Sequence, residues 1–190
     1  MSSALVLVAD GSEEIETLTP VDYLRRAGVD TKLVSVKEGK SVVMSHGVKL
    51  EADCDGSLIC ECLSKSELPD AVVVPGGMPG STNIAENEDV REFIKEMNAE
   101  GKLVCAICAA PAVVLPATGA LDGRDWTCYP GMEDNAAAYM HSFVESAVAH
   151  SGNLITARGP GAAEEFAMEI VRTLEGDDVA DEIKRASVQR

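Results

Sequence analysis

The chain has 190 residues, 46% of them hydrophobic, so it is long enough to bury a substantial core and too apolar for a disordered segment. Its 32 acidic and 16 basic residues give a net charge of −16 without any basic stripe, which excludes nucleic acid and anionic membrane surfaces as expected partners. No apolar stretch approaches the roughly 18 residues of a membrane helix. Residues 4–9 also lack the basic flank of an export signal. The six cysteines are therefore expected to be reduced thiols of a cytoplasmic protein, with the nucleus as a second compartment.

Short apolar runs alternate with helical segments along the chain. In chain order, the pattern predicts a strand at 4–9, a helix at 13–27, a strand at 31–36, a small hairpin at 42–44 and 47–50, a strand at 71–75, a helix at 90–100, a strand at 103–107, a helix at 111–118, a strand at 153–157, and helices at 162–174 and 177–184. Continuous apolar runs are typical of strands buried on both faces of a parallel sheet. Because β and α segments alternate without a linker or repeat, we expect one doubly wound α/β domain over residues 1–190.

Cys108 is the most informative residue for predicting the function. It directly follows the predicted strand at 103–107, and Pro111 suits the first turn of a helix because its missing N–H costs nothing there. The cysteine is therefore predicted to lie on a sharp strand-to-helix turn, where a nucleophile elbow places its nucleophile. The dipole of the following helix is expected to favour a thiolate over a thiol.

Two other segments are expected to meet Cys108 beyond the carboxyl ends of the strands, where open α/β sheets form their sites. They are residues 10–16 and 75–80. In the first, Glu13 and Glu14 fit an acidic first helical turn that complements the helix dipole. Glu16, by contrast, is expected to titrate jointly with a neighbouring thiol. It can then donate a hydrogen bond when protonated and move a substrate proton when ionised.

The pair Gly76-Gly77 has two interpretations that the sequence leaves open. It is either a tight turn or one half of an oxyanion hole, since a loop without side chains can bring a backbone N–H close to a reacting oxygen. In the second interpretation, the amide of Ala109 is the other donor.

The remaining motifs predict no cofactor and no metal. The loop Arg158-Gly-Pro-Gly161 precedes a helix, but Glu164 and Glu165 in its first turn would repel a phosphate, so we interpret it as a structural turn. No dinucleotide fingerprint or Walker A motif is present. Cys105 lies inside a predicted strand and is assigned to the core, whereas Cys128 is left without a role. Three further cysteines lack zinc-finger spacing: Cys54, Cys60 and Cys62.

Six motifs follow one another along the chain: Gly11-Ser-Glu-Glu-Ile-Glu16, Pro20-Val-Asp22, Arg25-Arg-Ala-Gly28, Val74-Pro-Gly-Gly77, Ala106-Ile-Cys-Ala-Ala-Pro111 and Arg158-Gly-Pro-Gly161. Together they resemble the DJ-one branch of the ThiJ/PfpI superfamily, over nearly the whole chain. The resemblance implies a flavodoxin-like three-layer α/β/α sandwich with a mainly parallel sheet. It also implies a homodimer in which Pro160 reaches the pocket of the partner subunit.

The resemblance also assigns roles at the site. Cys108 matches the reactive cysteine of the family, Glu16 the glutamate that hydrogen-bonds it, and Gly77 and Ala109 the backbone donors of the oxyanion site. Tyr129 is the fifth expected site residue, and it stands where many members have histidine. A cysteine–histidine dyad and peptidase chemistry are therefore not expected.

Two further positions depart from the animal members of the family. His46 stands where those proteins carry an arginine near the pocket, and Glu51 stands where they carry a peripheral cysteine. Redox behaviour at that second position need not transfer to this chain.

The resemblance implies a cofactor-free, glutathione-independent glyoxalase, a lyase of the D-lactate dehydratase type. Its substrates would be small dicarbonyls, with methylglyoxal converted to lactate and glyoxal to glycolate through a Cys108 hemithioacetal and with Glu16 as proton shuttle. Two alternatives use the same thiol: a stress sensor or chaperone that acts through oxidation of Cys108 to sulfinic acid, and a protein or nucleotide deglycase.

Overall fold

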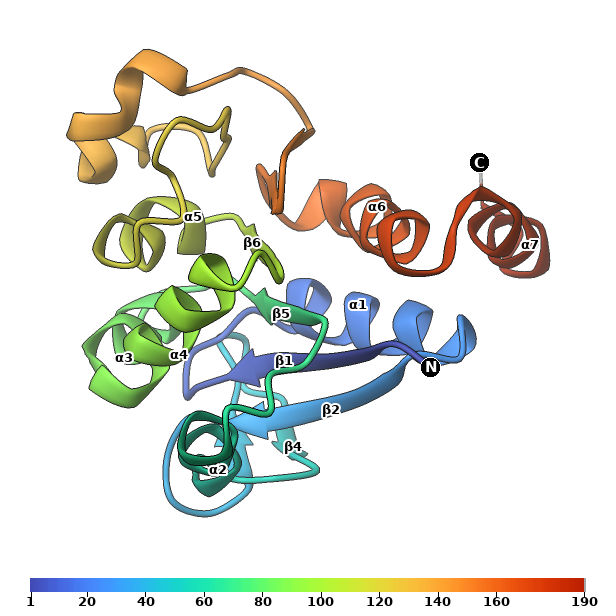
Figure 1. The fold of residues 1–190 in the computed structure, drawn as a ribbon, viewed down its shortest axis with the longest axis horizontal. Helices are drawn as coiled ribbons and strands as arrows, with labels where there is room; N and C mark the ends of the chain where they lie inside the picture. The colour runs from blue at the N-terminus through green and yellow to red at the C-terminus, as the bar shows by residue number, and fades with distance from the viewer. Residues whose placement is uncertain (190) are drawn as a thin grey trace.

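The computed structural model describes residues 1–189, whose centre is a mostly parallel sheet covered by helices on both faces (Figure 1). The sheet has the strand order β2-β1-β5-β6-β8-β7, in which only β7 runs antiparallel to its neighbour. Its strands are β1 (Ser3–Val8), β2 (Asp30–Ser35), β5 (Ala71–Val74), β6 (Leu103–Ile107), β7 (Val148–Ser151) and β8 (Leu154–Ala157). The sheet is therefore mainly parallel, as the continuous apolar runs predict.

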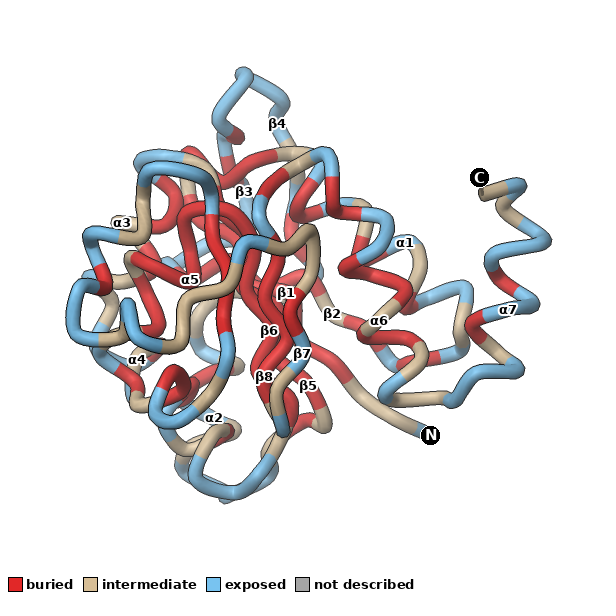
Figure 2. The backbone as a smooth tube through the Cα atoms, turned by 90° about the horizontal axis from the view of Figure 1, so that it is seen from above, coloured by how far each residue is buried: buried red, intermediate tan, exposed pale blue. Residues whose placement is uncertain are grey.

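Helices cover the two faces of the sheet in separate layers. One layer holds α1 (Glu14–Arg26), α6 (Ala163–Glu175) and α7 (Asp177–Ala186), and the other holds α2 (Ser57–Lys65), α3 (Gly80–Glu86), α4 (Glu88–Ala99) and α5 (Ala110–Val113). Each layer forms its own hydrophobic cluster with the sheet: Leu24 and Phe166 lie in one cluster, and Phe93 and Trp126 in the other. The central strands β5, β6 and β8 are buried along their whole length (Figure 2). This is the expected flavodoxin-like three-layer sandwich.

Most predicted elements are confirmed to within two residues. The small hairpin is β3 (Ser41–Val43) with β4 (Lys49–Glu51), and α1 continues through Pro20. The helix predicted at 111–118 is wrong in length: α5 ends at Val113, and a 3-10 turn, η1 (Leu115–Ala117), follows. Pro116 accounts for this break, because it has no N–H for a helical hydrogen bond and disfavours helical geometry in the preceding residue.

Five elements of the structure are not predicted by the sequence pattern. They are α2, α3, β7 and two 3-10 segments, η2 (Glu133–Ser142) and η3 (Pro160–Ala162). β7 is only partly buried and carries His150 and Ser151, so it lacks the apolar run by which the other strands are found.

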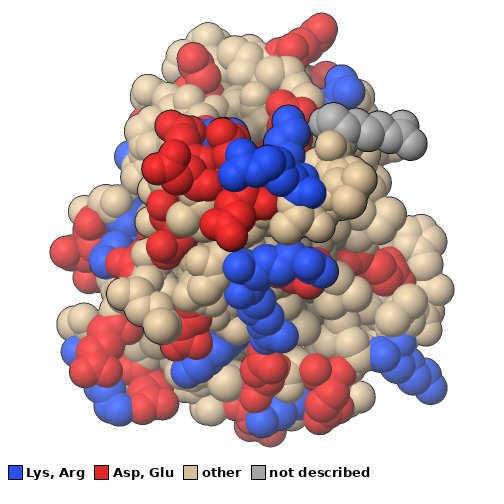
Figure 3. All heavy atoms as spheres, turned by 90° about the vertical axis from the view of Figure 1, so that its right-hand side faces the viewer, with Lys and Arg blue, Asp and Glu red and all other residues tan. Residues whose placement is uncertain are grey.

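The surface carries charges of both signs. Figure 3 shows the face with α6 and α7, on which basic groups are interspersed with acidic ones. Arg172 forms ion pairs with Glu169 at 3.0 Å and with Asp177 at 2.8 Å, so its charge is matched locally. Among residues 1–189, no helix is both long and apolar enough to cross a membrane.

Candidate active site

The three predicted loops meet at the carboxyl ends of β1, β5 and β6. Gly76 shows how closely they approach. A Cβ atom on Gly76 would lie 2.6 Å from Cys108 Cβ and 2.6 Å from Glu16 Oε2, so no side chain fits between these two residues. The predicted convergence of residues 10–16, 75–80 and 108–111 is therefore confirmed.

Cys108 lies in the turn between β6 and α5 with a φ of 64°, in the left-handed region. This conformation costs a non-glycine residue about 1–3 kcal/mol, so the surroundings must hold it. The Cys108 N–H donates to Ala157 O at 2.8 Å, and Cys108 O accepts from Tyr129 N–H at 2.8 Å. Two neighbouring segments thus fix the backbone, and 9% of the residue remains exposed.

Glu16 comes from the first turn of α1 and has no exposed surface. The Gly76 N–H donates to its Oε2 at 2.9 Å, whereas Oε1 is buried without a hydrogen-bond partner among the described residues. Burial raises the pKa of Glu16 to about 7, against the opposing effects of the Cys108 thiol and the Gly76 amide. The carboxyl group therefore exchanges its proton near neutral pH.

Burial also raises the pKa of Cys108, to about 12, and the negative charge of ionised Glu16 acts in the same direction. The expectation that the helix dipole favours a thiolate is therefore wrong while Glu16 is ionised. α5 has only four residues, and burial outweighs its dipole. Two negative charges cannot share this space, so a thiolate requires a protonated Glu16, and the pair titrates as a unit.

Two backbone N–H groups oppose the effect of burial on Cys108. The amides of Gly77 and Ala109 interact with the thiol and lower its pKa. Neither N–H donates to a backbone oxygen within residues 1–189. Gly77 has a φ of 86°, and a Cβ there would lie 2.5 Å from Gly11 O and 2.6 Å from Glu13 N. Only glycine fits this approach, which both interpretations of Gly76-Gly77, a tight turn and one half of an oxyanion hole, require.

Tyr129 contributes its backbone to the site, while its side chain is 47% exposed. A Cβ on Gly159 would lie 3.2 Å from the Tyr129 ring, so the ring rests against the loop at 158–161. Within this segment, η3 begins at Pro160. Cys105 is fully buried in the core as predicted, and Cys128, which the sequence left without a role, is also a core residue.

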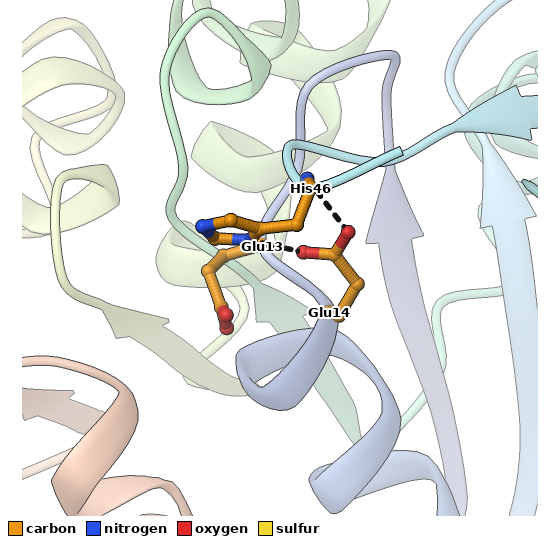
Figure 4. Close-up of side chains that lie close together, drawn as sticks. All are labelled: Glu13, Glu14 and His46. Carbon is orange, nitrogen blue, oxygen red and sulfur yellow. Dashed lines mark hydrogen bonds and ion pairs between the residues drawn. The ribbon is translucent and has the colours of Figure 1, made fainter. Parts of the chain in front are cut away.

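At the N-terminus of α1, a small polar cluster is formed by Glu13, Glu14 and His46 (Figure 4). Their ligand atoms lie within 4.8 Å of one another, so these three residues are the group among residues 1–189 that could hold a metal ion. Glu14 already accepts hydrogen bonds from His46 N–H at 2.7 Å and from Ser45 Oγ at 2.9 Å. The cluster also lies at the positive end of the α1 dipole, which disfavours a cation.

Two site residues were not found by sequence reasoning. Gly76, rather than Gly77, holds Glu16 through its N–H. Glu13 was interpreted only as part of an acidic first helical turn, but it is the N-cap residue of α1, is 9% exposed and accepts the Glu16 N–H at 2.8 Å. The Gly-Gly pair in the sequence was a usable signal for Gly76. No local feature of the sequence distinguishes Glu13 from Glu14.

Comparisons with known proteins identify the family of the chain. The model of the DJ-1/PfpI family matches residues 2–173. The Parkinson disease protein 7 homolog of Danio rerio is 38% identical over 95% of this chain and 94% of that protein. A Caenorhabditis elegans relative named "Glutathione-independent glyoxalase DJR-1.2" is 32% identical over 93% of this chain and 90% of its own length.

The chain spans less than half of two plant relatives. It covers 45% and 41% of the Arabidopsis thaliana DJ-1 homologs A and B, with 34% and 35% identity. Among solved structures, oxidized Toxoplasma gondii DJ-1 superposes with a TM-score of 0.91 and 36% identity, covering 99% of this chain and 98% of that one. By sequence and by fold, the chain belongs to the DJ-1/PfpI family.

Proposed function

We propose that the protein is a glutathione-independent glyoxalase that converts methylglyoxal to lactate and glyoxal to glycolate. The observation that carries the proposal is a buried carboxyl group with a pKa of about 7 beside a cysteine and two backbone N–H groups. The name of the nematode relative supports the same activity. The identity of the substrate belongs to the proposal.

In the first step, ionised Glu16 takes the Cys108 proton while the sulfur attacks the aldehyde carbon and forms a C–S bond. The carbonyl electron pair moves to oxygen, where the Gly77 and Ala109 amides stabilise the negative charge. Protonated Glu16 then returns its proton to this oxygen. The product is a hemithioacetal, and the carboxylate is regenerated.

In the second step, the Glu16 carboxylate removes the proton from the former aldehyde carbon, and the electron pair forms an enediolate as the ketone oxygen takes up the negative charge. The proton of the adjacent hydroxyl group then passes to this oxygen. Glu16 delivers its proton to the neighbouring carbon, and the remaining oxyanion becomes the carbonyl group of a thioester. Water releases the thioester as lactate and restores the thiol. One carbon is oxidised and its neighbour reduced, so no external electron acceptor is needed.

Replacing either reacting group tests this mechanism. Cys108→Ser is expected to abolish D-lactate formation from methylglyoxal without glutathione. Glu16→Gln is expected to lower kcat/KM by roughly 100- to 10,000-fold, the usual size of a general acid–base contribution. Cys60→Ser, which changes an exposed thiol on α2, is the matched control and keeps full activity. Full turnover in Glu16→Gln would contradict the shuttle role, and stoichiometric loss of dicarbonyl without lactate would contradict catalysis.

The number of protons that Glu16 and Cys108 hold together predicts how kcat/KM depends on pH. Below the Glu16 pKa of about 7, Glu16 and Cys108 both hold protons, so neither a base nor a nucleophile is present. Above it, the pair carries one negative charge. We expect kcat/KM for methylglyoxal to rise about tenfold for each pH unit below the Glu16 pKa and to level off above it. A profile without a midpoint near neutrality in the wild-type protein would contradict this role of Glu16.

Sensing of oxidative stress is a second candidate, supported by the similarity to oxidized Toxoplasma gondii DJ-1. Two equivalents of peroxide would transfer one oxygen each to the Cys108 sulfur and leave as water, giving a sulfinate. Protonated Glu16 and the Gly77 and Ala109 amides would then donate to its oxygens.

Mass spectrometry after mild peroxide treatment tests the sensor. We expect one species with two added oxygen atoms, located by peptide mapping at Cys108, although Cys60 is more exposed. Glu16→Gln removes the carboxyl proton donor and is expected to shift the product towards higher oxidation or mixed species. Equal oxidation of Cys60 and Cys108 would contradict a dedicated sensor.

We further propose that a second copy of the chain covers the outer face of α1. Ile15 and Leu18 are 52% and 42% exposed there, beside a groove that Pro160 also lines. Exposed apolar side chains next to a buried site favour a protein interface. Light scattering coupled to size exclusion is expected to give a dimer for the wild type and a monomer for Leu18→Glu. The control Met140→Glu, on η2, stays dimeric, and a monomeric wild type would contradict the proposal.

A further inference from the structure

Three hydrogen bonds form a closed circuit behind the reacting groups. The Glu13 N–H donates to Gly76 O at 3.1 Å, the Gly76 N–H donates to Glu16 Oε2 at 2.9 Å, and the Glu16 N–H donates to Glu13 Oε2 at 2.8 Å. The circuit joins the beginning of α1 to the loop after β5. Each of the three residues both donates and accepts, so displacement of any one disturbs the position of the Glu16 carboxyl group.

Glu13 has the one side chain of this circuit that the proposed mechanism does not use. It precedes α1 as its N-cap residue, with φ −81° and ψ 135°, although shorter side chains such as Ser or Asp are preferred there. Its carboxylate is largely buried, with 9% of the residue exposed. Its backbone also lies against Gly77, because a Cβ on Gly77 would approach Glu13 N to 2.6 Å. Glu13 therefore contacts both halves of the site.

We propose that Glu13 is a positioning residue of this site: its carboxylate fixes the Glu16 backbone against the Gly76-Gly77 loop, and its negative charge favours the protonated form of the Glu16 side chain. This proposal rests on the proposed function, because Glu16 transfers a proton during catalysis only if the protein is a glyoxalase. A protonated Glu16 is also the form that permits a Cys108 thiolate, so Glu13 would influence the thiol through Glu16.

The charged and titratable groups around Glu16 support this role. Cys108 faces it from the β6–α5 turn, and Glu13 faces it from its own helix; the charge of Glu13 raises the pKa of Glu16, in addition to the larger effect of burial. His46 faces Glu13 from the β3–β4 turn, and its own pKa is raised, mainly by its hydrogen bond with Glu14. The Glu14 carboxylate accepts hydrogen bonds from Ser45 Oγ and from the His46 N–H.

Glu14 therefore offers a matched control with the same change in net charge. The experiment is a ¹³C NMR titration of the Glu16 carboxyl carbon in the full chain without substrate, with the resonance assigned by its loss in Glu16→Gln. In Glu13→Gln the amide oxygen can still accept the Glu16 N–H, and we expect the Glu16 pKa to fall by about 1 pH unit when the neighbouring charge is removed. Glu14→Gln is expected to leave it unchanged. An unchanged Glu16 pKa in folded Glu13→Gln would overturn the proposal.

A second pair of variants keeps the experiment decisive if Glu13→Gln does not fold. Asp and Asn are both favoured N-cap residues and differ in charge but hardly in shape. Glu13→Asp is expected to keep the Glu16 pKa near the wild-type value, and Glu13→Asn to lower it by about 1 pH unit. Equal values in these two variants would also overturn the proposal. Because no substrate is present, absence of glyoxalase turnover would refute the proposed function without deciding the role of Glu13.

Discussion

The burial of one carboxyl group, Glu16, is the constraint on which the rest of the site depends. A carboxylate removed from water is unfavourable unless hydrogen bonds or a proton compensate it. Here one oxygen accepts the Gly76 N–H and the other has no hydrogen-bond partner within residues 1–189, so the group keeps its proton up to about neutral pH. This proton links the carboxyl group to Cys108, because the two residues cannot both be ionised in the same buried space.

Close backbone approach is what makes that burial possible. Gly76 leaves no room for a side chain between Cys108 and Glu16, and Gly77 lies against the backbones of Gly11 and Glu13. The left-handed conformation of Cys108 directs the chain from β6 into α5 and is held by hydrogen bonds to Ala157 and Tyr129. Segments that are distant in the sequence hold this strained conformation in place, so the site depends on the complete sheet.

The same chemistry serves both candidate functions. A glyoxalase needs a nucleophilic sulfur, amides that stabilise an oxyanion and a group that moves one proton. A sensor needs a sulfur that reacts with peroxide and donors that stabilise the oxidised product. Cys108, Glu16, Gly77 and Ala109 meet both sets of requirements. The two functions therefore differ in what reaches the thiol and in how fast the product leaves.

The sequence by itself determined the order of the helices and strands and the location of the site. Continuous apolar runs identified the strands, and the motifs at 10–16, 75–80 and 108–111 identified the loops that meet, because strand periodicity and glycine chemistry are local properties. Only the tertiary structure decided that Glu13 is buried, whereas Glu14 forms a hydrogen bond with His46. It also decided that the helix after Cys108 is too short to dominate the pKa of the thiol. Finally, it decided that Glu16 holds a proton near neutral pH. Those properties arise from burial and from contacts between distant segments, which a local sequence pattern does not contain.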